Sequence, residues 1–397
     1  NPILPAPLWN NTDAAPDAER LNRQANFAAE VGSRLVASFT IAKVAHLART
    51  QPSILPSVVA ICLPHDWLTW KLTGNLVTDR GDASGSGWWS PISESPRRDL
   101  LELAAGAGFA SSVRIPDVLG PNQRAGVLTQ EAASYLGLTP GIPVGPGSGD
   151  NMGAALGIGA VPGHYVVSLG TSGTAYAVSD DPTADPTGEV SGFADATGRY
   201  LPLACMLNCT RVVDAVATLT GTTLVQALDS AGQLDPGAGG LLLMPYLAGE
   251  RTPNLPYSTG SLFGMRMANL DPARLARAAV DGVAAGLAYC LQALQRLNLI
   301  ESRVVLVGGG SAHSTWQQAI ADATQLPVTV LGGREHVALG AAVQAAAIAT
   351  GESVADISDR WRPPVAAIAH PRADFATRFR LEERQELIDA ERARDAI

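Results

Sequence analysis

A glycine-rich segment with one acidic residue is the strongest candidate for chemistry in this sequence. It reads G-S-G-D-N-M-G over residues 147–153, and Asp150 lies where a Gly/Pro-dense loop meets a predicted helix. Glycines beside a carboxylate let a ligand approach the backbone closely, so Asp150 could act on a bound substrate with Asn151 beside it. Alternatively, an Asp at this place caps the helix N-terminus. The segment alone favours the capping role.

A second glycine-rich turn has the composition of a phosphate site. It reads S-L-G-T-S-G over residues 168–173 and lies between two β-branched runs, 165–169 and 174–178, which predicts a hairpin. Consecutive N–H groups in such a turn, with the hydroxyls of Thr171 and Ser172, could hold phosphate oxygens. An ordinary hairpin of small residues explains the pattern equally well. The pattern GxxxxGK[ST] is absent, which excludes a Walker-type NTPase.

A third segment, V-V-L-V-G-G-G-S over residues 304–311, predicts a strand that runs into three glycines. A helix predicted over 314–325 follows. Backbone without side chains could pack flat against a planar ligand here. The alternative is a dinucleotide-type turn, although no GxGxxG is present.

The segment P-Y-L-A-G-E-R-T-P over residues 245–253 carries the adjacent charges Glu250 and Arg251 in a Pro-bounded loop. A loop-fixing ion pair or a capping set is the favoured interpretation.

The elements around these motifs indicate an α/β protein of two domains. Up to about residue 160, short helices alternate with turns; after it, a hairpin and alternating strands and helices imply a mixed sheet. A long helix is predicted after Asp271 as N-cap and Pro272 as first residue, with its apolar residues on one face. We expect domains over 1–160 and 161–385.

The charged C-terminal sequence predicts a surface helix, with a C-terminal tail over 386–397. The net charge of −9 argues against nucleic acid as a partner. No apolar run has the roughly 18 residues of a membrane span. The four cysteines form no CxxC pair, which favours free thiols in a reducing cytosol. The sequence leaves the oligomeric state open, and a homodimer is compatible with it.

Taken in order, these motifs resemble the FGGY family of carbohydrate kinases. The resemblance runs from about Leu8 to Ala345. Leu8-Trp9-Asn10 is similar to the family's W-N-D-x-R segment, with Asn11 where Asp is usual, and residues 39–43 are similar to F-T-A-P-K. Residues 63–85 resemble the L-P-K-D-Y-L…T-D-x-S-D-A-S-G pattern of the xylulokinase branch.

The resemblance implies the two-domain fold of actin and other RNase H-like ATPases. It implies ATP and Mg²⁺ as cofactors, D-xylulose as the phosphoryl acceptor, and Asp150 as general base with an indirect role at the metal. It also implies three sets of binding residues. These are Gly170, Thr171 and Ser172 for the phosphates; Gly309, Gly310, Ser311 and Ser314 for adenosine; and Trp9, Asn10, Asp150 and Asn151 for the sugar.

Two family elements are not found in these 397 residues: the opening phosphate turn and a later substrate segment that contains Met-His-Gly or its equivalent. Family members open with a strand and a D-x-G-T-x-S phosphate turn, and the sequence begins just before the W-N segment. We therefore expect the chain as written, made alone, to be inactive and poorly soluble. We expect activity when a segment that carries this turn is present, in cis or from another chain. Two other functions stay open: a kinase for another ketose or polyol, such as ribulose, and a nucleotide-binding protein without catalysis.

Overall fold

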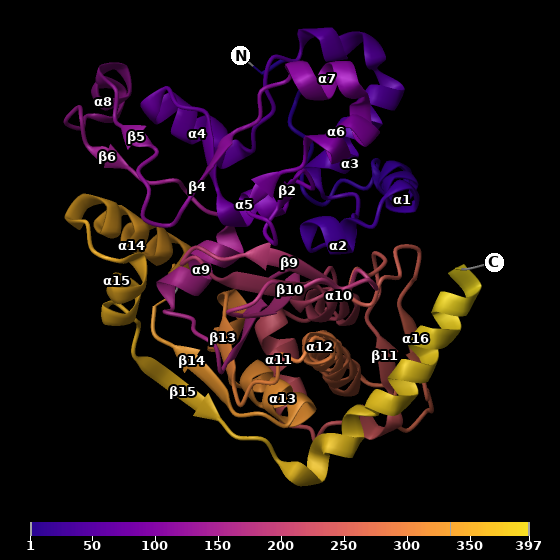
Figure 1. The fold of residues 1–397 in the computed structure, drawn as a ribbon. Helices are drawn as coiled ribbons and strands as arrows, with labels where there is room; N and C mark the ends of the chain where they lie inside the picture. Colours follow the sequence, from indigo (N-terminus) through magenta and orange to yellow (C-terminus); the bar gives the residue numbers. More distant parts are fainter. Residues whose placement is uncertain (1, 334, 396–397) are drawn as a thin grey trace. The chain divides into compact units, whose positions relative to one another are not determined.

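The computed structural model describes residues 2–333 and 335–395 (Figure 1). The chain divides into two compact units, each assembled from three stretches of sequence. The first comprises Asn1–Ala160, Ser179–Pro202 and Glu335–Arg362, and the second comprises Val161–Val178, Leu203–Arg334 and Pro363–Ile397. The first unit thus takes in two stretches from beyond residue 160.

The first unit is mainly helical. Its α-helices are α1 (Ala15–Gln24), α2 (Phe27–Val31), α3 (Thr40–Thr50), α4 (Pro64–Thr73), α5 (Arg80–Ser84), α6 (Arg98–Ala105), α7 (Ala107–Ser112), α8 (Gln130–Leu136), α9 (Asp150–Gly157), α14 (His336–Thr350) and α15 (Val354–Arg360). Its short strands pair two by two: β1 (Val77–Asp79) with β4 (Asp117–Leu119), β2 (Trp89–Ser90) with β3 (Ser95–Pro96), and β5 (Gly126–Val127) with β6 (Pro143–Val144). Strand β9 (Val190–Ala194) also belongs to it.

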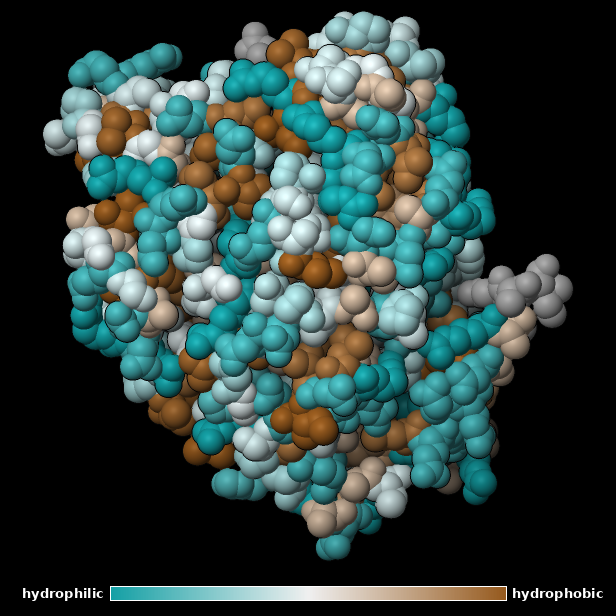
Figure 2. All heavy atoms as spheres, in the orientation of Figure 1, coloured by the Kyte–Doolittle hydropathy of each residue, from teal (hydrophilic) through white to brown (hydrophobic). Residues whose placement is uncertain are grey.

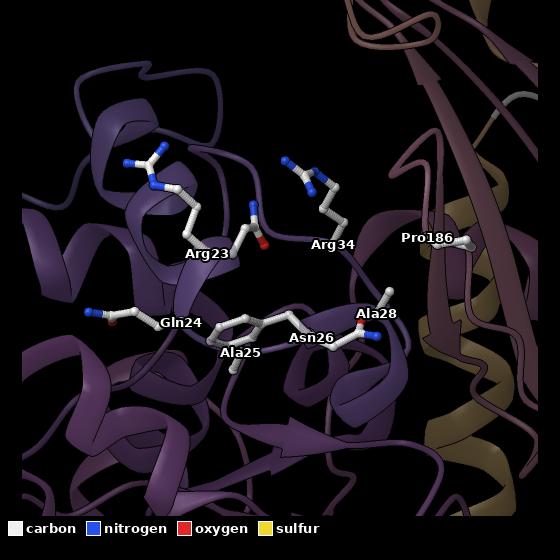
Figure 3. A pocket seen from close by; sticks show the side chains of 9 residues that line it. Arg23, Gln24, Ala25, Asn26, Ala28, Arg34 and Pro186 are labelled. Atoms are coloured by element: carbon white, nitrogen blue, oxygen red, sulfur yellow. The ribbon is translucent and has the colours of Figure 1, made fainter.

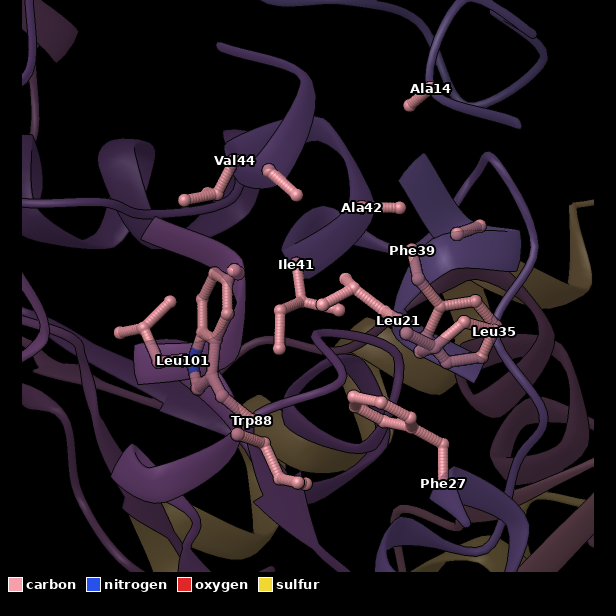
Figure 4. Packing of buried hydrophobic residues seen from close by; sticks show 14 of the residues in the cluster. Ala14, Leu21, Phe27, Leu35, Phe39, Ile41, Ala42, Val44, Trp88 and Leu101 are labelled. Carbon is pink, nitrogen blue, oxygen red and sulfur yellow. The ribbon is translucent and has the colours of Figure 1, made fainter. Parts of the chain in front are cut away.

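A hydrophobic core joins α1, α2, α3 and α6 in this unit (Figure 4). Leu21, Phe27, Leu35, Ile41 and Leu101 are each at most 1% exposed and point into one cluster. Burying a side chain of this size contributes on the order of 1.5–3 kcal/mol. This core therefore holds together α1, α2 and α3, which precede α4 and α5 in the chain, and α6, which follows them.

Helices α9 and α14 pack together more closely than side chains would normally allow (Figure 1). A Cβ at Gly157 would overlap the carbonyl oxygen of His336, and one at Gly340 would overlap that of Gly153. Only glycine fits at these positions, because interiors leave no space for a further methyl group. The contact brings α14 against the helix that begins at Asp150.

The second unit is built on a mixed sheet with the strand order β15-β14-β13-β7-β8-β10. These strands are β7 (Tyr165–Leu169), β8 (Gly173–Ala177), β10 (Tyr200–Met206, of which Leu203 onward belongs here), β13 (Val304–Val307), β14 (Val328–Leu331) and β15 (Val365–Ala369). Strand β7 pairs antiparallel with β8 and parallel with β13. The predicted hairpin is confirmed, and so is the mixed α/β class with two domains.

Helices and a small strand pair complete the second unit. They are α10 (Thr210–Thr220), α11 (Leu224–Gly232), α12 (Pro272–Gln295), α13 (Ser314–Thr324) and α16 (Leu381–Asp395), with β11 (Leu242–Met244) paired to β12 (Ser261–Phe263). The start of α12 is confirmed, because Asp271 is its N-cap and accepts from the Arg274 amide. The apolar face predicted for α12 is buried, but so are its other faces, because residues 276–291 are buried on every side.

Helix α16 lies on the surface, as predicted, and hydrophilic side chains follow it in Figure 2. Two of its residues nevertheless anchor it. Ile388 joins a buried cluster with Leu242 and Tyr246, and the buried Arg384 donates to the carbonyl of Leu243 at 2.6 Å. The predicted boundary at residue 385 falls inside this helix. Across the described ranges, no helix combines the length and apolarity needed to cross a bilayer.

The α9–α14 contact generates a stability prediction. Gly340→Ala places a methyl group into the Gly153 backbone, so we expect a loss of about 1–3 kcal/mol in the free energy of unfolding. The matched control is Gly108→Ala in α7, where a Cβ meets nothing within 4 Å. That variant should be neutral or slightly stabilising, because Ala favours a helix over Gly. Urea unfolding monitored by circular dichroism measures both, and equal stabilities would contradict the close contact.

Candidate active site

Asp150 occupies the first position of α9. The N-cap of this helix is Gly149, so Asp150 is not its capping residue. Its Oδ1 accepts from the Asn151 backbone amide at 2.8 Å and from Asn151 Nδ2 at 2.9 Å. The Asp150 side chain is otherwise exposed at the end of a glycine loop. The neighbouring amide therefore orients a solvent-facing carboxylate, which suits a group that accepts a proton from a ligand.

The loop before Asp150 is held by a residue from far along the chain. Gln344 of α14 accepts from the Gly147 amide at 3.0 Å and donates to the Gly147 carbonyl at 2.9 Å. Both ends of one side-chain amide are used, and Gln344 is buried. The Gln344 side chain thus pairs with both backbone groups of Gly147, as a neighbouring strand would. This pairing limits the backbone motion of the glycine loop just before the candidate base.

A cluster of one histidine and three aspartates lies against the same loop. His65 Nε2 is 2.9 Å from Asp82 Oδ2, 3.2 Å from Asp79 Oδ1 and 3.4 Å from Asp66 Oδ1. His65 and Asp66 come from α4, Asp79 ends β1, and Asp82 belongs to α5. Asp79 also caps α5, since it accepts from the Gly81 amide at 2.8 Å.

The charges in this cluster shift the pKa values strongly. Burial disfavours the charged form of His65, but Asp79, Asp82 and Asp66 outweigh it and raise the pKa of His65 to about 11. Burial raises the pKa of Asp66 to about 6, against the attraction of His65. At neutral pH His65 is therefore a cation surrounded by carboxylates.

The predicted phosphate turn joins β7 to β8 in the second unit. Gly170 and Ser172 are half-buried, Thr171 is exposed, and the Gly170 amide donates to the Ser172 carbonyl at 3.1 Å. The carbonyls of Gly170 and Thr171 accept from the backbone amides of Thr210 and Cys209, at 3.1 and 3.3 Å. These two hydrogen bonds to residues 209–210 fix the turn at the end of the hairpin.

The Pro-bounded loop over residues 245–253 supports this turn indirectly, through the segment that binds it. Glu250 is 1% exposed, and its carboxylate accepts from the Leu207 amide at 2.6 Å and from Asn208 Nδ2 at 3.0 Å. Burial raises the pKa of Glu250, although the Asn208 side chain and the surrounding amides oppose this. Residues 207–208 lead directly into Cys209 and Thr210, which bind the turn. Glu250 thus fixes this loop through hydrogen bonds from amide groups, including the Arg251 backbone amide at 2.8 Å.

The third glycine segment packs beside the turn. Strand β13 ends at Val307, parallel to β7, and the glycines that follow approach Leu169 at the end of β7. A Cβ at Gly310 would lie 2.6 Å from Leu169 Cδ2, whereas a Cβ at Gly309 would meet nothing within 4 Å. Gly309 is therefore the glycine that faces open space, and Gly310 is required for packing.

Ser311 and Ser314 follow these glycines. Ser311 is buried, and its Oγ donates to the Gly308 carbonyl at 2.7 Å. Ser314 is exposed and begins α13, whose N-cap is His313. The structure thus brings the phosphate turn and this segment together at the ends of two adjacent parallel strands.

Trp9 and Asn10 lie on an exposed turn of the first unit, and Trp9 is 51% exposed. Lys43 of α3 holds the residues before them, since its Nζ donates to the carbonyl of Leu8 at 3.0 Å. Burial lowers the pKa of Lys43. No hydrogen bond in the described part of the chain connects Trp9 or Asn10 with Asp150.

Two hollows are present in the described part of the first unit. One, of about 410 Å³, is lined by residues 22–28, Arg34 and Pro186 (Figure 3). Arg34 on its rim pairs with Glu19 at 3.0 Å. The other, of about 480 Å³, includes Asp66, Thr78 and Trp89 in its lining. Neither is lined by a residue of the predicted site.

Sequence reasoning missed His65, the Asp79–Asp82 pair and Gln344. Asp79 and Asp82 lie in the T-D-R-G-D segment, which contributed only to the family resemblance. The adjacent His65 and Asp66, followed by Asp79 and Asp82 three residues apart, could have indicated a charged cluster. Gln344 had none, because it lies in an Ala-rich helix almost 200 residues from its partner.

Family comparisons cover most of the chain. The N-terminal domain of the FGGY family of carbohydrate kinases matches residues 1–157, and its C-terminal domain matches residues 165–349. A xylulose kinase of Streptomyces coelicolor is 44% identical over 365 residues, which are 91% of this chain and 73% of the relative. A xylulose kinase of Streptomyces rubiginosus is 44% identical over 369 residues, with the same two coverages.

A solved structure agrees with these relatives. The crystal structure of xylulose kinase from Bifidobacterium adolescentis superimposes with a TM-score of 0.82 at 36% sequence identity. The match covers 95% of this chain and 82% of that one. The two-domain α/β architecture is therefore one that solved sugar kinases share.

Proposed function

Because the chain belongs to the FGGY family of carbohydrate kinases, which are ATP-dependent phosphotransferases, we propose that it phosphorylates D-xylulose to D-xylulose 5-phosphate. The observation that carries the choice of sugar is the 44% identity to a xylulose kinase over 91% of this chain. The geometry around Asp150 and around residues 170–172 supports the two halves of this reaction separately.

Asp150 is proposed as the general base. The oxygen on C5 of the sugar attacks the γ-phosphorus of ATP, its proton passes to the Asp150 carboxylate, and the bond from that phosphorus to the β,γ-bridging oxygen breaks to release ADP. Phosphoryl transfer depends mainly on positioning and charge stabilisation. The Asn151 amides at 2.8 and 2.9 Å hold one carboxylate oxygen of Asp150, which supports this role because the carboxylate is oriented in advance.

The nucleotide is assigned to the second unit. Gly170, Thr171 and Ser172 are proposed to bind the terminal phosphates through amides and hydroxyls. Gly309, Gly310 and Ser311 are proposed to form the wall beside adenosine, with Gly309 facing the ligand, Gly310 and Ser311 packed behind it, and the exposed Ser314 near the base. The Glu250 carboxylate, which accepts from Leu207 and Asn208, supports this assignment because it stabilises the segment that binds the turn.

Mg²⁺ fits an exposed carboxylate such as Asp150, because this ion keeps several waters and takes one or two carboxylates together with substrate phosphates. When bound, it would neutralise charge on the phosphates. Asp150 would contact it indirectly, through water. Trp9 is proposed to pack against the carbon face of the sugar, with Asn10 and Asn151 as polar contacts.

Substrate choice is tested by ADP release across D-xylulose, D-ribulose, glycerol and gluconate. We expect the highest kcat/KM with D-xylulose, because specificity is the ratio of these values. A higher value with another acceptor would show a kinase for a different sugar or polyol. ATP binding without turnover on any acceptor would show a nucleotide-binding protein.

The base is tested by Asp150→Asn, which keeps the shape and removes the proton acceptor. We expect kcat to fall by roughly 10²–10⁴-fold while ATP binding is retained. Asp356→Asn is the matched control, since Asp356 is likewise an exposed Asp in the first turn of a helix. Steady-state kinetics and calorimetric ATP titration measure both variants. If Asp150→Asn keeps more than about a tenth of kcat, Asp150 is not the base.

The adenosine site is tested by Gly309→Val. The new side chain enters open space, so the fold should persist while KM for ATP rises by about tenfold or more. KM for the sugar should stay unchanged. Gly310→Val serves as the comparison, because its Cβ meets Leu169 and should lower stability instead. Unaltered ATP affinity in Gly309→Val would remove these glycines from the site.

A further inference from the structure

The loop that carries Asp150 rests directly on the side chains of His65 and Asp82. A Cβ at Gly147 would lie 2.7 Å from His65 Nδ1, and a Cβ at Gly149 would lie 2.5 Å from Asp82 Oδ1. Both distances are below those that real Cβ atoms adopt, so a side chain at either position would displace His65 or Asp82. Gln344 binds the same Gly147 through both backbone groups. The loop is therefore fixed by two independent sets of contacts.

The charge balance of the cluster makes His65 indispensable to this arrangement. Three carboxylates, those of Asp66, Asp79 and Asp82, have an oxygen within 3.4 Å of its Nε2. In the described residues, none of the three forms an ion pair with a lysine or arginine. Asp66 is 1% exposed, and its Oδ1 makes no hydrogen bond within the described chain. Without a cation at this place, buried like charges would repel one another, and removing one partner of a buried pair is strongly destabilising.

We propose that His65 is a positioning residue, which acts through Asp82 and the Gly147–Gly149 loop to hold Asp150 at the reacting hydroxyl. This inference rests on the proposed role of Asp150 as base. Asp82 is the link, because it is 2.9 Å from His65 Nε2 and directly faces Gly149, the residue before Asp150. A second contact ties the same elements together: a Cβ at Gly81 of α5 would lie 2.7 Å from Met152 Cγ of α9. A displaced Asp82 would therefore move the start of α9.

The same atoms could hold a metal ion, since ligand atoms of His65, Asp79 and Asp82 lie within 4.8 Å of one another. A histidine must be neutral to bind a metal. The carboxylates raise the pKa of His65 to about 11, so at pH 7 a metal ion would have to displace its proton. The cluster thus favours the imidazolium over a metal.

The central test compares His65→Gln with His65→Lys. The first removes the charge and the second keeps it on a flexible side chain. We expect His65→Gln to lower kcat by about 10–100-fold with KM for ATP unchanged, because a misplaced base slows chemistry and leaves nucleotide binding intact. His65→Lys should recover most of kcat. Equal kcat in wild type and His65→Gln, or equal losses in Gln and Lys variants, would overturn the proposal.

Two further variants separate positioning from simple destabilisation. His46→Gln is the matched control, because His46 also pairs with a buried aspartate, Asp17, at 3.3 Å and does not contact the loop. It should leave kcat unchanged. Gly149→Ala pushes the same loop off Asp82 and should reproduce the loss of kcat seen in His65→Gln. If Gly149→Ala keeps wild-type kcat, the loop is not positioned by this contact, and the proposal is wrong.

Stability against pH gives a readout independent of activity. The groups facing His65 are Asp66 from α4, Asp79 from β1 and Asp82 from α5. The pKa of His65 is raised from 6.5 to about 11, so its stabilising effect is complete below pH 6.5 and is lost as pH rises toward 11. Wild type should therefore be more stable than His65→Gln at pH 6, with a difference that shrinks toward pH 10. A difference that does not change with pH would contradict a charged His65.

The remaining experiments distinguish the rival outcomes. If Asp150→Asn retains full kcat, the proposed function of Asp150 fails, whatever the His65 variants do. If Asp150→Asn is inactive and His65→Gln is fully active, only the positioning proposal fails. Zn²⁺ or Mn²⁺ added alone to the wild-type protein should not raise its melting temperature. A rise that His65→Lys abolishes would identify a metal site and overturn the proposal.

Discussion

The close approach of α9 to α14 is the contact on which the candidate active site depends. Gly157 and Gly340 leave no space for a methyl group between the two helices, because a Cβ at either would overlap a backbone carbonyl oxygen of the other helix. In the sequence, α14 comes after most of the second unit. In the structure it belongs to the first unit, where it packs against α9. It brings Gln344 to the Gly147 backbone, and so to the residues just before Asp150. A helix far along the sequence thus sets the position of the glycine loop, and the small side chains along both helices follow from that requirement.

The two functional loops are held by different kinds of interaction. The loop before Asp150 lies on a charged cluster, where His65 offsets three carboxylates and no neutral side chain could do so. The turn over residues 170–172 depends on the carboxylate of Glu250, whose partners are backbone amides and the Asn208 side chain. Hydrogen bonds satisfy this buried carboxylate without a cation. The first arrangement responds to charge and pH, whereas the second depends mainly on geometry.

Local signals predicted much of the second unit. The hairpin of β7 and β8 and the Asp271 cap with Pro272 each have a short sequence pattern with a physical cause. The charged cluster escaped prediction because its members lie on α4, β1 and α5 and meet only after folding. The burial of α12 escaped it for a related reason: elements on every side of the helix bury it, and periodicity within one helix does not reveal them. Tertiary packing, and not local propensity, therefore determines both the charged cluster and the burial of α12.

Each candidate group is positioned by residues of its own unit. Asp150 depends on His65, Asp82 and Gln344 in the first, and the phosphate turn depends on Asn208, Thr210 and Glu250 in the second. Support that is internal to a unit lets each half keep its geometry whatever the state of the other. Substitutions far apart with no shared partners add in free energy, whereas those within one network do not. A double variant with one change in each set should therefore show additive effects on transition-state free energy, and two changes within the His65 cluster should not.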